Sequence, residues 1–138
     1  MRKILLTKKL NEKNAALFKG IPDLELVTIS DNDPAAFQNH IRDAEAILLS
    51  TAYKMTREVI QSAEKLKVIS RTGVGVDNVD VGAATERGIM VLNTPQANSL
   101  SVAEHTVALI IAISKQLVMY DDAVRSGNFQ IRRLNKSV

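Results

Sequence analysis

The part of this sequence best suited to chemistry is a glycine-containing run, Arg71-Thr72-Gly73-Val74-Gly75-Val76-Asp77-Asn78-Val79-Asp80. Two glycines separated by one residue let the backbone turn tightly and approach a ligand closely. Consecutive N–H groups in such a turn can form a nest that binds an anion, for example a carboxylate. A tight strand-to-helix turn without a ligand has the same spacing, so both interpretations stay open at this point.

The two glycines do not form the dinucleotide-binding fingerprint. The pattern G-x-G-x-x-G requires glycine where Asn78 stands, followed about 20 residues later by an acidic residue at a strand end. Neither requirement is met. The spacing by itself therefore predicts a turn that either binds a small anion or binds nothing.

The other chemically capable side chains indicate structure more than catalysis. Asp80 is placed to cap a helix, and Asp77 is of the type that ties a turn. His40 falls on a predicted helix face and His105 in the first turn of another helix, and neither has a carboxylate or nucleophile partner in the sequence pattern. No metal-ligand spacing is found, and the absence of cysteine excludes a disulfide framework and a thiolate metal site.

Short apolar strands alternate with helices along the first 98 residues. We expect strands at 3–7, 24–29, 46–49, 67–70 and 89–92. Five strands with intervening helices require a parallel sheet with right-handed crossovers. We therefore predict a flavodoxin-like, doubly wound α/β fold with strand order 2-1-3-4-5, in which the run 71–80 lies at the carboxyl edge, where ligands bind.

Residues with capping chemistry mark the helix ends. Asn11, Asp33 and Asp80 can accept a hydrogen bond from a free backbone N–H, and Pro34 fits a first helical position because it has no N–H to leave unpaired. Gly20 suits the left-handed residue that ends a helix. These signals predict helices at 11–20, 33–42, 56–63 and 80–87.

A long helix is predicted from Ser101 to about Met119. Ser101 and Glu104 have the S-x-x-E spacing of a capping box. The middle of the helix, residues 107–113, is apolar on every side, whereas a surface helix shows a polar face. We expect it to be covered by its own chain, another domain or a second copy. Because the run is far shorter than the ~20 residues of a membrane span, no membrane partner is expected.

The positive net charge belongs to the end of the chain. The net charge of +3 includes four basic residues that follow Asp122, so the rest carries −1; these four are Arg125, Arg132, Arg133 and Lys136. A nucleic-acid-binding domain needs a basic face, so no nucleic-acid partner is expected. No secretory signal precedes Lys8, and the lack of cysteine fits a reducing compartment, which predicts a cytoplasmic location.

Two other ligand classes share the predicted architecture. A flavodoxin needs a hydroxyl-rich phosphate loop after the first strand, and residues 7–11 are poor in hydroxyls. A phospho-receiver needs acidic residues at the ends of the first and third strands, where this sequence has Thr7 and Ser50. Both classes are excluded.

Several segments, in order and at matching spacing, resemble the D-isomer-specific 2-hydroxyacid dehydrogenases, most nearly those of the D-3-phosphoglycerate dehydrogenase type. The combination is specific although each motif alone is weak, and it extends over nearly the whole chain. The segments are residues 71–80, Glu86-Arg87-Gly88-Ile89, Asn93-Thr94-Pro95 and 98–106.

The resemblance implies a domain organisation. Residues 1–98 correspond to the substrate-binding domain. Residues 99–120 correspond to an interdomain helix that, in relatives, also makes much of the dimer contact, so a homodimer through Val102–Val118 is expected. Residues 121–138 lead toward an NAD-binding Rossmann domain.

The resemblance also implies roles for particular residues. The backbone of Gly73, Val74 and Gly75 corresponds to the loop that holds the carboxylate of a small 2-hydroxy or 2-keto acid. Thr51 occupies the other strand end that faces the substrate. Asn98 and Ser101 lie where such enzymes bring the nicotinamide of NAD close.

Departures from the family pattern are equally informative. The family's G-x-G-x-x-G loop and its catalytic Arg, Glu and His have no counterpart in these 138 residues, so no catalytic residue is assigned. We expect the chain alone to be inactive and not to bind NAD tightly. Ser50 stands where the phosphoglycerate enzymes carry a phosphate-holding Arg, which leaves Lys54 or Arg57 as substitutes. The alternative to an enzyme fragment is a non-catalytic dimerisation or small-anion-binding module.

Overall fold

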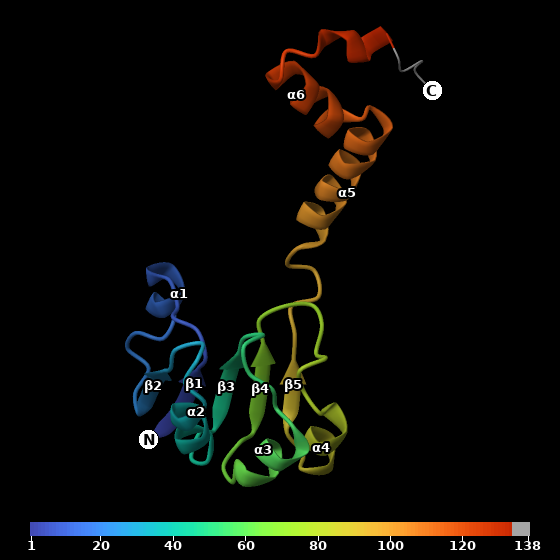
Figure 1. The fold of residues 1–138 in the computed structure, drawn as a ribbon. Coiled ribbons are helices and arrows are strands. Elements are labelled where there is room, and N and C mark those ends of the chain that lie inside the picture. Colours follow the sequence, from blue (N-terminus) through green and yellow to red (C-terminus); the bar gives the residue numbers. More distant parts are fainter. Residues whose placement is uncertain (134–138) are drawn as a thin grey trace. The chain divides into compact units, whose positions relative to one another are not determined.

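The computed structural model describes residues 1–133 and divides the chain into two compact units, Met1–Ala97 and a second unit that begins at Asn98. The first unit contains a five-stranded sheet (Figure 1) with strands β1 Arg2–Leu6, β2 Leu24–Thr28, β3 Ala46–Leu49, β4 Val68–Arg71 and β5 Met90–Leu92. Its helices are α1 Glu12–Ala16, α2 Pro34–Ile41, α3 Arg57–Ser62 and α4 Val81–Glu86.

All strands of this sheet are parallel, and their order is β2-β1-β3-β4-β5. The predicted flavodoxin-like α/β fold is therefore confirmed, with strand limits that differ from the predicted ones by no more than one residue, the usual uncertainty of such limits. Because the strands are parallel, the loops that follow them all leave from one edge of the sheet.

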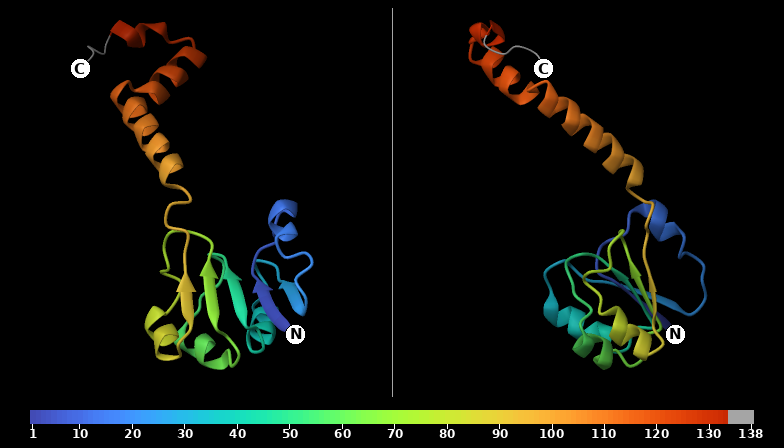
Figure 2. Two further views of the ribbon diagram at one scale, coloured as in Figure 1. Left: turned by 180° about the vertical axis from the view of Figure 1, so that it is seen from behind. Right: turned by 90° about the vertical axis from the view of Figure 1, so that its right-hand side faces the viewer.

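One face of the sheet carries the core of the first unit. Figure 2 shows α2, α3 and α4 gathered on one side of the sheet. Alternate strand residues point toward these helices, as the period of two in a strand requires. The fully buried members of this core include Leu5, Ile47, Leu49, Ile69, Ile41 and Ile60. By contrast, α1 has no buried residue.

The predicted cap residues form the predicted contacts. The side chains of Asn11, Asp33 and Asp80 each accept a hydrogen bond of 2.8 Å from the backbone N–H three residues later. The predicted end of the first helix at Gly20 is wrong, because α1 ends at Ala16. From there the chain continues to Gly20, which has φ +79°, through turns in which each N–H donates to the carbonyl three residues earlier.

The second unit contains α5 Ser99–Ser114, α6 Leu117–Arg125 and a short 3-10 helix, Phe129–Arg133. The prediction of one continuous helix to Met119 is wrong, because Gln116 adopts a left-handed conformation with φ 51° and the two helices are bent by 61°. The hydroxyl of Ser114 donates to the carbonyl of Ile111, a local bond that competes with helix continuation. No single helix in residues 1–133 has the length and hydropathy of a membrane span, although the bent pair α5 and α6 together meets both measures.

The predicted capping box at the start of this helix is also wrong. The N-cap is Asn98, which makes no side-chain capping bond, and Ser101 lies inside the first turn. The helix extends upstream because each added residue gains a backbone bond, here from Val102 N–H to the Asn98 carbonyl at 2.9 Å. No residue of α5 is buried, and Val107, Ile110 and Ile113 are all more than half exposed.

Candidate functional site

The polar and glycine residues singled out in the first unit meet at the carboxyl edge of its sheet. The loop after β3 carries Thr51, the loop after β4 carries the glycine turn, and the loop after β5 begins with Asn93 and Thr94. The adjacency of β3, β4 and β5 places the three loops next to one another. Thr51 and Gly75 are exposed, so this edge is accessible within the first unit.

The glycine turn is held through its carbonyl groups. Thr94 N–H donates to the carbonyl of Gly73 at 2.9 Å, and the side-chain Nδ2 of Asn93 donates to the carbonyl of Val74 at 2.7 Å. In a planar trans peptide the N–H points opposite to the carbonyl of the same unit, and the described chain has no cis peptide bond. The N–H groups of Val74 and Gly75 therefore both point away from the β5 loop.

These two N–H groups have no hydrogen-bond acceptor within residues 1–133. Gly73 differs, since its own N–H donates to the carbonyl of Arg71 at 3.0 Å and closes a tight three-residue turn. Of the three residues predicted to hold a carboxylate, only Val74 and Gly75 thus offer a free backbone donor. Two adjacent N–H groups aimed to one side are the geometry of an anion-binding nest.

Side chains around the turn lie close to its glycines and add charge. A Cβ atom at Gly73 would collide with the guanidinium of Arg71, which folds back over the turn and donates to the carbonyl of Thr72 at 2.8 Å. Asp77 was predicted to tie the turn, but its carboxylate makes no hydrogen bond in the described part of the chain and lies beside Gly75. The turn therefore has the cationic side chain of Arg71 and the anionic side chain of Asp77 close to it.

Thr51 stands on a firmly held segment. The neighbouring Ser50 is buried, its N–H donates to the hydroxyl of Thr7 at 2.7 Å, and its own hydroxyl accepts from the N–H of Ala52 at 3.3 Å. The hydroxyl pair Thr7–Ser50, which served only to exclude a phospho-receiver, is thus a structural link between the ends of β1 and β3. The loop after β3 also enters the core through Tyr53, whose ring stacks on Phe37 at a centroid separation of 4.6 Å.

Asn78 joins the loops after β3 and β4, a role that the sequence pattern did not reveal. Its side chain is buried, and its Nδ2 donates to the carbonyls of Ser50 at 3.0 Å and Tyr53 at 2.8 Å. Its backbone carbonyl accepts from Met55 N–H at 2.8 Å, and the carbonyl of Met55 accepts from Asp80 N–H at 2.9 Å. The only signal in the sequence was an amide side chain shortly after two glycines, and a residue type alone does not identify its hydrogen-bond partners.

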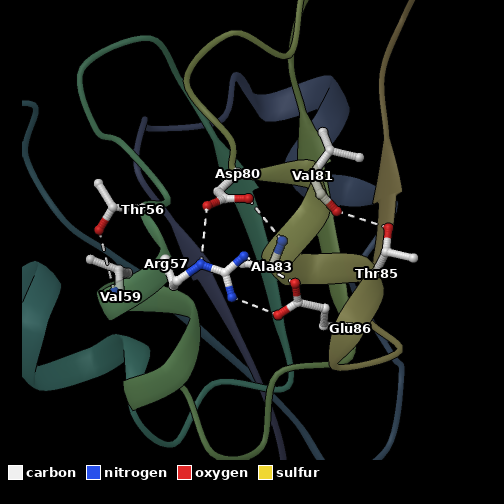
Figure 3. A network of polar contacts seen from close by, with 8 residues as sticks. All are labelled: Thr56, Arg57, Val59, Asp80, Val81, Ala83, Thr85 and Glu86. Atoms are coloured by element: carbon white, nitrogen blue, oxygen red, sulfur yellow. Dashed lines mark hydrogen bonds and ion pairs between the residues drawn. The ribbon is translucent and has the colours of Figure 1, made fainter.

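Arg57 belongs to an ion-pair network beside this site (Figure 3). Its guanidinium contacts the Glu86 carboxylate, with nitrogen–oxygen distances of 2.5 and 3.1 Å, and Asp80 at 3.8 Å. The hydrogen bond to Glu86 raises the pKa of Arg57, and the same bond lowers the pKa of Glu86. This exposed network links α3 to α4, and it engages Arg57 with two carboxylates.

Lys54 is the remaining candidate for a second anionic group. Its side chain is exposed and forms no ion pair with any residue of the range 1–133. It borders a surface pocket whose other lining residues include Thr56, Asp77 and Asn78. Of the two predicted substitutes for a phosphate-holding Arg, Lys54 is therefore available and Arg57 is not.

The remaining predicted residues lie elsewhere. Asn98 and Ser101 belong to the second unit, at the start of α5. His40 is half-buried and accepts a hydrogen bond from Lys3 Nζ at 3.1 Å, while His105 is exposed on α5. Among the described residues no group of three His, Cys, Asp or Glu side chains is arranged to hold a metal ion.

The fold and this edge define a class of α/β protein that binds ligands at the carboxyl ends of parallel strands, and comparisons with known proteins narrow it. A family described as D-isomer specific 2-hydroxyacid dehydrogenase, catalytic domain, matches residues 4–130. D-3-phosphoglycerate dehydrogenase of Methanocaldococcus jannaschii is 40% identical over 133 residues, which cover 96% of this chain and 25% of that protein.

Solved structures give the same result. D-lactate dehydrogenase from Aquifex aeolicus, complexed with NAD and lactic acid, superposes with a TM-score of 0.75 and 26% identity over 93% of this chain and 38% of that one. The NAD-bound 3-phosphoglycerate dehydrogenase of Entamoeba histolytica has a TM-score of 0.66 and 30% identity over 80% of this chain and 38% of that one. The chain belongs to the D-isomer-specific 2-hydroxyacid dehydrogenase family, and it spans about a quarter of the length of the Methanocaldococcus jannaschii relative.

Proposed function

We propose that this chain supplies the substrate-holding part of an NAD-dependent oxidoreductase that acts on the CH–OH group of a small D-2-hydroxy acid or on its 2-keto partner. The observation that carries this proposal is the pair of free N–H groups at Val74 and Gly75. Two donors aimed to one side suit a carboxylate, and hydrogen bonds to an ionised acceptor are roughly twice as strong as neutral ones. Thr51 forms the opposite wall of this proposed site.

The glycine turn and the start of α4 do not form a cradle for the NAD pyrophosphate. The helix after the glycine turn, α4, has its N-terminus occupied by the carboxylate of Asp80, which accepts from Ala83 N–H, and a dinucleotide cradle requires that end to be free for a phosphate. The position of the third fingerprint glycine is held by buried Asn78. We place Asn98 and Ser101 near the nicotinamide, and we expect the rest of the cofactor site outside these residues.

We expect no measurable dehydrogenase turnover from the 138 residues alone. Positioned acid–base groups and electrostatic groups each contribute rate factors of about 10² to 10⁴. A catalytic set of an Arg, a Glu and a His is not assigned at this site, and neither of the chain's two histidines lies in the loops that form it. NADH oxidation with pyruvate, measured on the purified chain, would contradict this expectation.

Within this class, 3-phosphoglycerate is the substrate that the named relatives favour. Its phosphate requires a cation in addition to the carboxylate nest, and Lys54 is the one of the two predicted substitutes that remains available. Replacing Lys54 with Met keeps the length of the side chain and removes its charge. We expect this change to weaken binding of 3-phosphoglycerate and to leave binding of pyruvate, which has no phosphate, unchanged.

The proposed function is tested by titrating the isotopically labelled chain with pyruvate in two-dimensional ¹H–¹⁵N NMR. We expect the amide signals of Val74 and Gly75 to shift most, and that of Gly73 to shift less because its N–H is already engaged. Pyruvamide, in which a neutral amide replaces the carboxylate, is the matched control and should leave these signals in place. Equal responses to both compounds, or none at the turn, would refute the carboxylate nest.

A second role, in self-association, is favoured by the exposed apolar surface of α5. We propose that residues Val102–Val118 pair with a second copy of the chain, since an apolar surface of this kind is otherwise prone to association. Ile110→Glu should shift the chain toward monomer in sedimentation analysis, whereas Gln38→Glu, which adds the same charge at an exposed position of α2, should not. A wild-type chain that stays monomeric at high concentration would count against this role.

A further inference from the structure

We infer that Asn78 is a positioning residue that fixes the orientation of the Ser50–Thr51 peptide, and with it Thr51, on the loop next to the proposed anion-binding turn. This inference rests on the proposed function, because it concerns the second wall of the same site. It extends that function from the two donors of the glycine turn to Thr51, on the loop after β3. It also assigns the coupling between the loops after β3 and β4 to one buried side chain, that of Asn78.

The assignment of the Asn78 amide is fixed by its partners. Both groups that it meets, the carbonyls of Ser50 and Tyr53, are acceptors, so the NH₂ group and not the oxygen must face them. The two carbonyls lie on either side of Thr51 and Ala52, and each is bound by one N–H of the same NH₂ group. A single planar group therefore fixes both ends of the short segment that carries Thr51.

The orientation of the Thr51 N–H follows from this contact. The carbonyl of Ser50 points to Asn78, so the N–H of Thr51, in the same planar trans peptide, points away from it. This N–H has no acceptor in the described residues, as is also true of Val74 and Gly75. Asn78 and Asn93 therefore act in the same way. Asn78 binds the carbonyl of Ser50, which leaves the N–H of Thr51 pointing away, and Asn93 binds the carbonyl of Val74, which leaves the N–H of Gly75 pointing away.

The contact is well suited to transmit position because it is buried. Asn78 is 8% exposed, and the segments on both sides of it are tied by backbone bonds to Met55. A parallel bridge between Met55 and Val79 continues the pairing of β3 and β4 past the ends of those strands. A displacement of the β4 loop is therefore passed to the β3 loop.

Asn78→Asp is the sharpest test, because it has the same shape and replaces the NH₂ group, which supplies both donors, with an oxygen that repels the Ser50 and Tyr53 carbonyls. Asn32→Asp is the matched control, since it makes the same charge change at an exposed position whose side chain forms no hydrogen bond within residues 1–133. Ile41→Val, a mild change in the buried core, controls for a general loss of stability.

The experiment compares these variants by ¹H–¹⁵N NMR, first unliganded and then titrated with pyruvate. In the unliganded N78D chain we expect the amide signal of Thr51 to move and the order parameter of that amide to fall. The amide signals of Val74 and Gly75 should stay in place. On titration we expect about a tenfold weaker affinity and the loss of the Thr51 response only. Wild-type signals and affinity in N78D, or equal losses in N32D or Ile41→Val, would overturn the inference.

Acidification provides a rescue that a merely structural defect would not show. Burial beside two carbonyls raises the pKa of the introduced carboxyl above the usual value of about 3.9. Below its pKa the group becomes a donor again, so the Thr51 signal of N78D should return toward that of the wild type as the pH is lowered. A response that does not depend on pH would contradict the positioning role.

Two further outcomes are separable. If pyruvate binds neither wild type nor variant, the proposed function fails, yet the unliganded Thr51 signal still decides whether Asn78 orients that peptide. If N78D does not fold, Asn78→Ser, which keeps one donor, takes its place with the same criteria. An Asn78→Ser chain with a wild-type Thr51 signal would then refute the inference.

Discussion

The two units of this chain treat their apolar residues in opposite ways. In the first unit the alternate strand residues and the helices α2, α3 and α4 bury one another, so that Ile47 and Ile69 have almost no exposed surface. In the second unit α5 has sixteen residues and buries none of them. The first unit is therefore organised around its own core, whereas the second carries a helix whose apolar surface is left uncovered by the described residues.

The same contrast appears in the polar contacts. At the carboxyl edge of the first unit, side chains reach across 20 or more residues, as in the bond from Asn78 to Ser50, 28 residues earlier. In α5 the side-chain bonds are local, such as that from Thr106 to the carbonyl of Val102, four residues away. Long-range polar contacts fix loops in space, and this is why the candidate site is built in the first unit.

The largest expected effect is on the core of the first unit. Ile69→Ala should lower the free energy of unfolding by about 2–5 kcal/mol, because it leaves a cavity in a fully buried position. The change Val124→Ala, at a position 56% exposed on α6 and outside the proposed pairing surface, should alter it by less than about 0.5 kcal/mol. Chemical denaturation of both variants measures this difference, and equal losses would erase the contrast between the two units.

A smaller effect should follow from removing a cap at the site. Asp80→Ala deletes the bond to Ala83 N–H and the ion pair with Arg57, and should cost about 1–2 kcal/mol. Asp121→Ala in α6 removes only an exposed pair with Arg125 one turn away and should cost about 0.3–0.5 kcal/mol. Thermal unfolding distinguishes the two, and a greater loss from Asp121→Ala would reverse the comparison.

The smallest effect should be an acid-dependent one at the opposite edge of the sheet. The hydrogen bond from Lys3 lowers the pKa of Asp43, so its contribution is complete above the unfolded value of about 3.9 and is lost as the pH falls through the lower folded value. Because Asp43 is 54% exposed, the contribution should be a few tenths of a kcal/mol.

Asp43→Asn should remove this dependence, as read from denaturation curves between pH 2 and pH 6, the range set by that unfolded pKa. Asp31→Asn removes a charge that forms no ion pair in the described residues, and serves as the control. An unchanged acid dependence in Asp43→Asn would assign the effect to another carboxylate.

Most of the first unit could be predicted from the sequence because its signals are local. Strands showed as short apolar runs, and Asp33 with Pro34 marked a helix start by their side-chain chemistry alone. The break at Gln116 could not be predicted in this way, because a left-handed residue other than glycine or asparagine has no distinctive sequence signal. The start of α5 was missed for a related reason, since Ser101 fits a capping box equally well whether or not the helix begins there.

The candidate site was predicted in part. The glycine spacing located the turn, but the sequence could not reveal that Gly73 uses its own N–H internally, since this depends on backbone geometry. It also could not reveal that Arg57 is engaged by Glu86, 29 residues away, or that Asn78 holds the loop after β3. Residue types indicate which chemistry is available, whereas only the fold determines which partners meet.

The central claim, that the free N–H groups of Val74 and Gly75 hold a small carboxylate, is tested most directly by a crystal structure of the chain with pyruvate bound. We predict carboxylate oxygens within the usual N–H···O distance, about 2.7–3.2 Å, of both nitrogens. A structure in which these N–H groups bond to the protein itself, or in which pyruvate occupies a different place, would contradict the account.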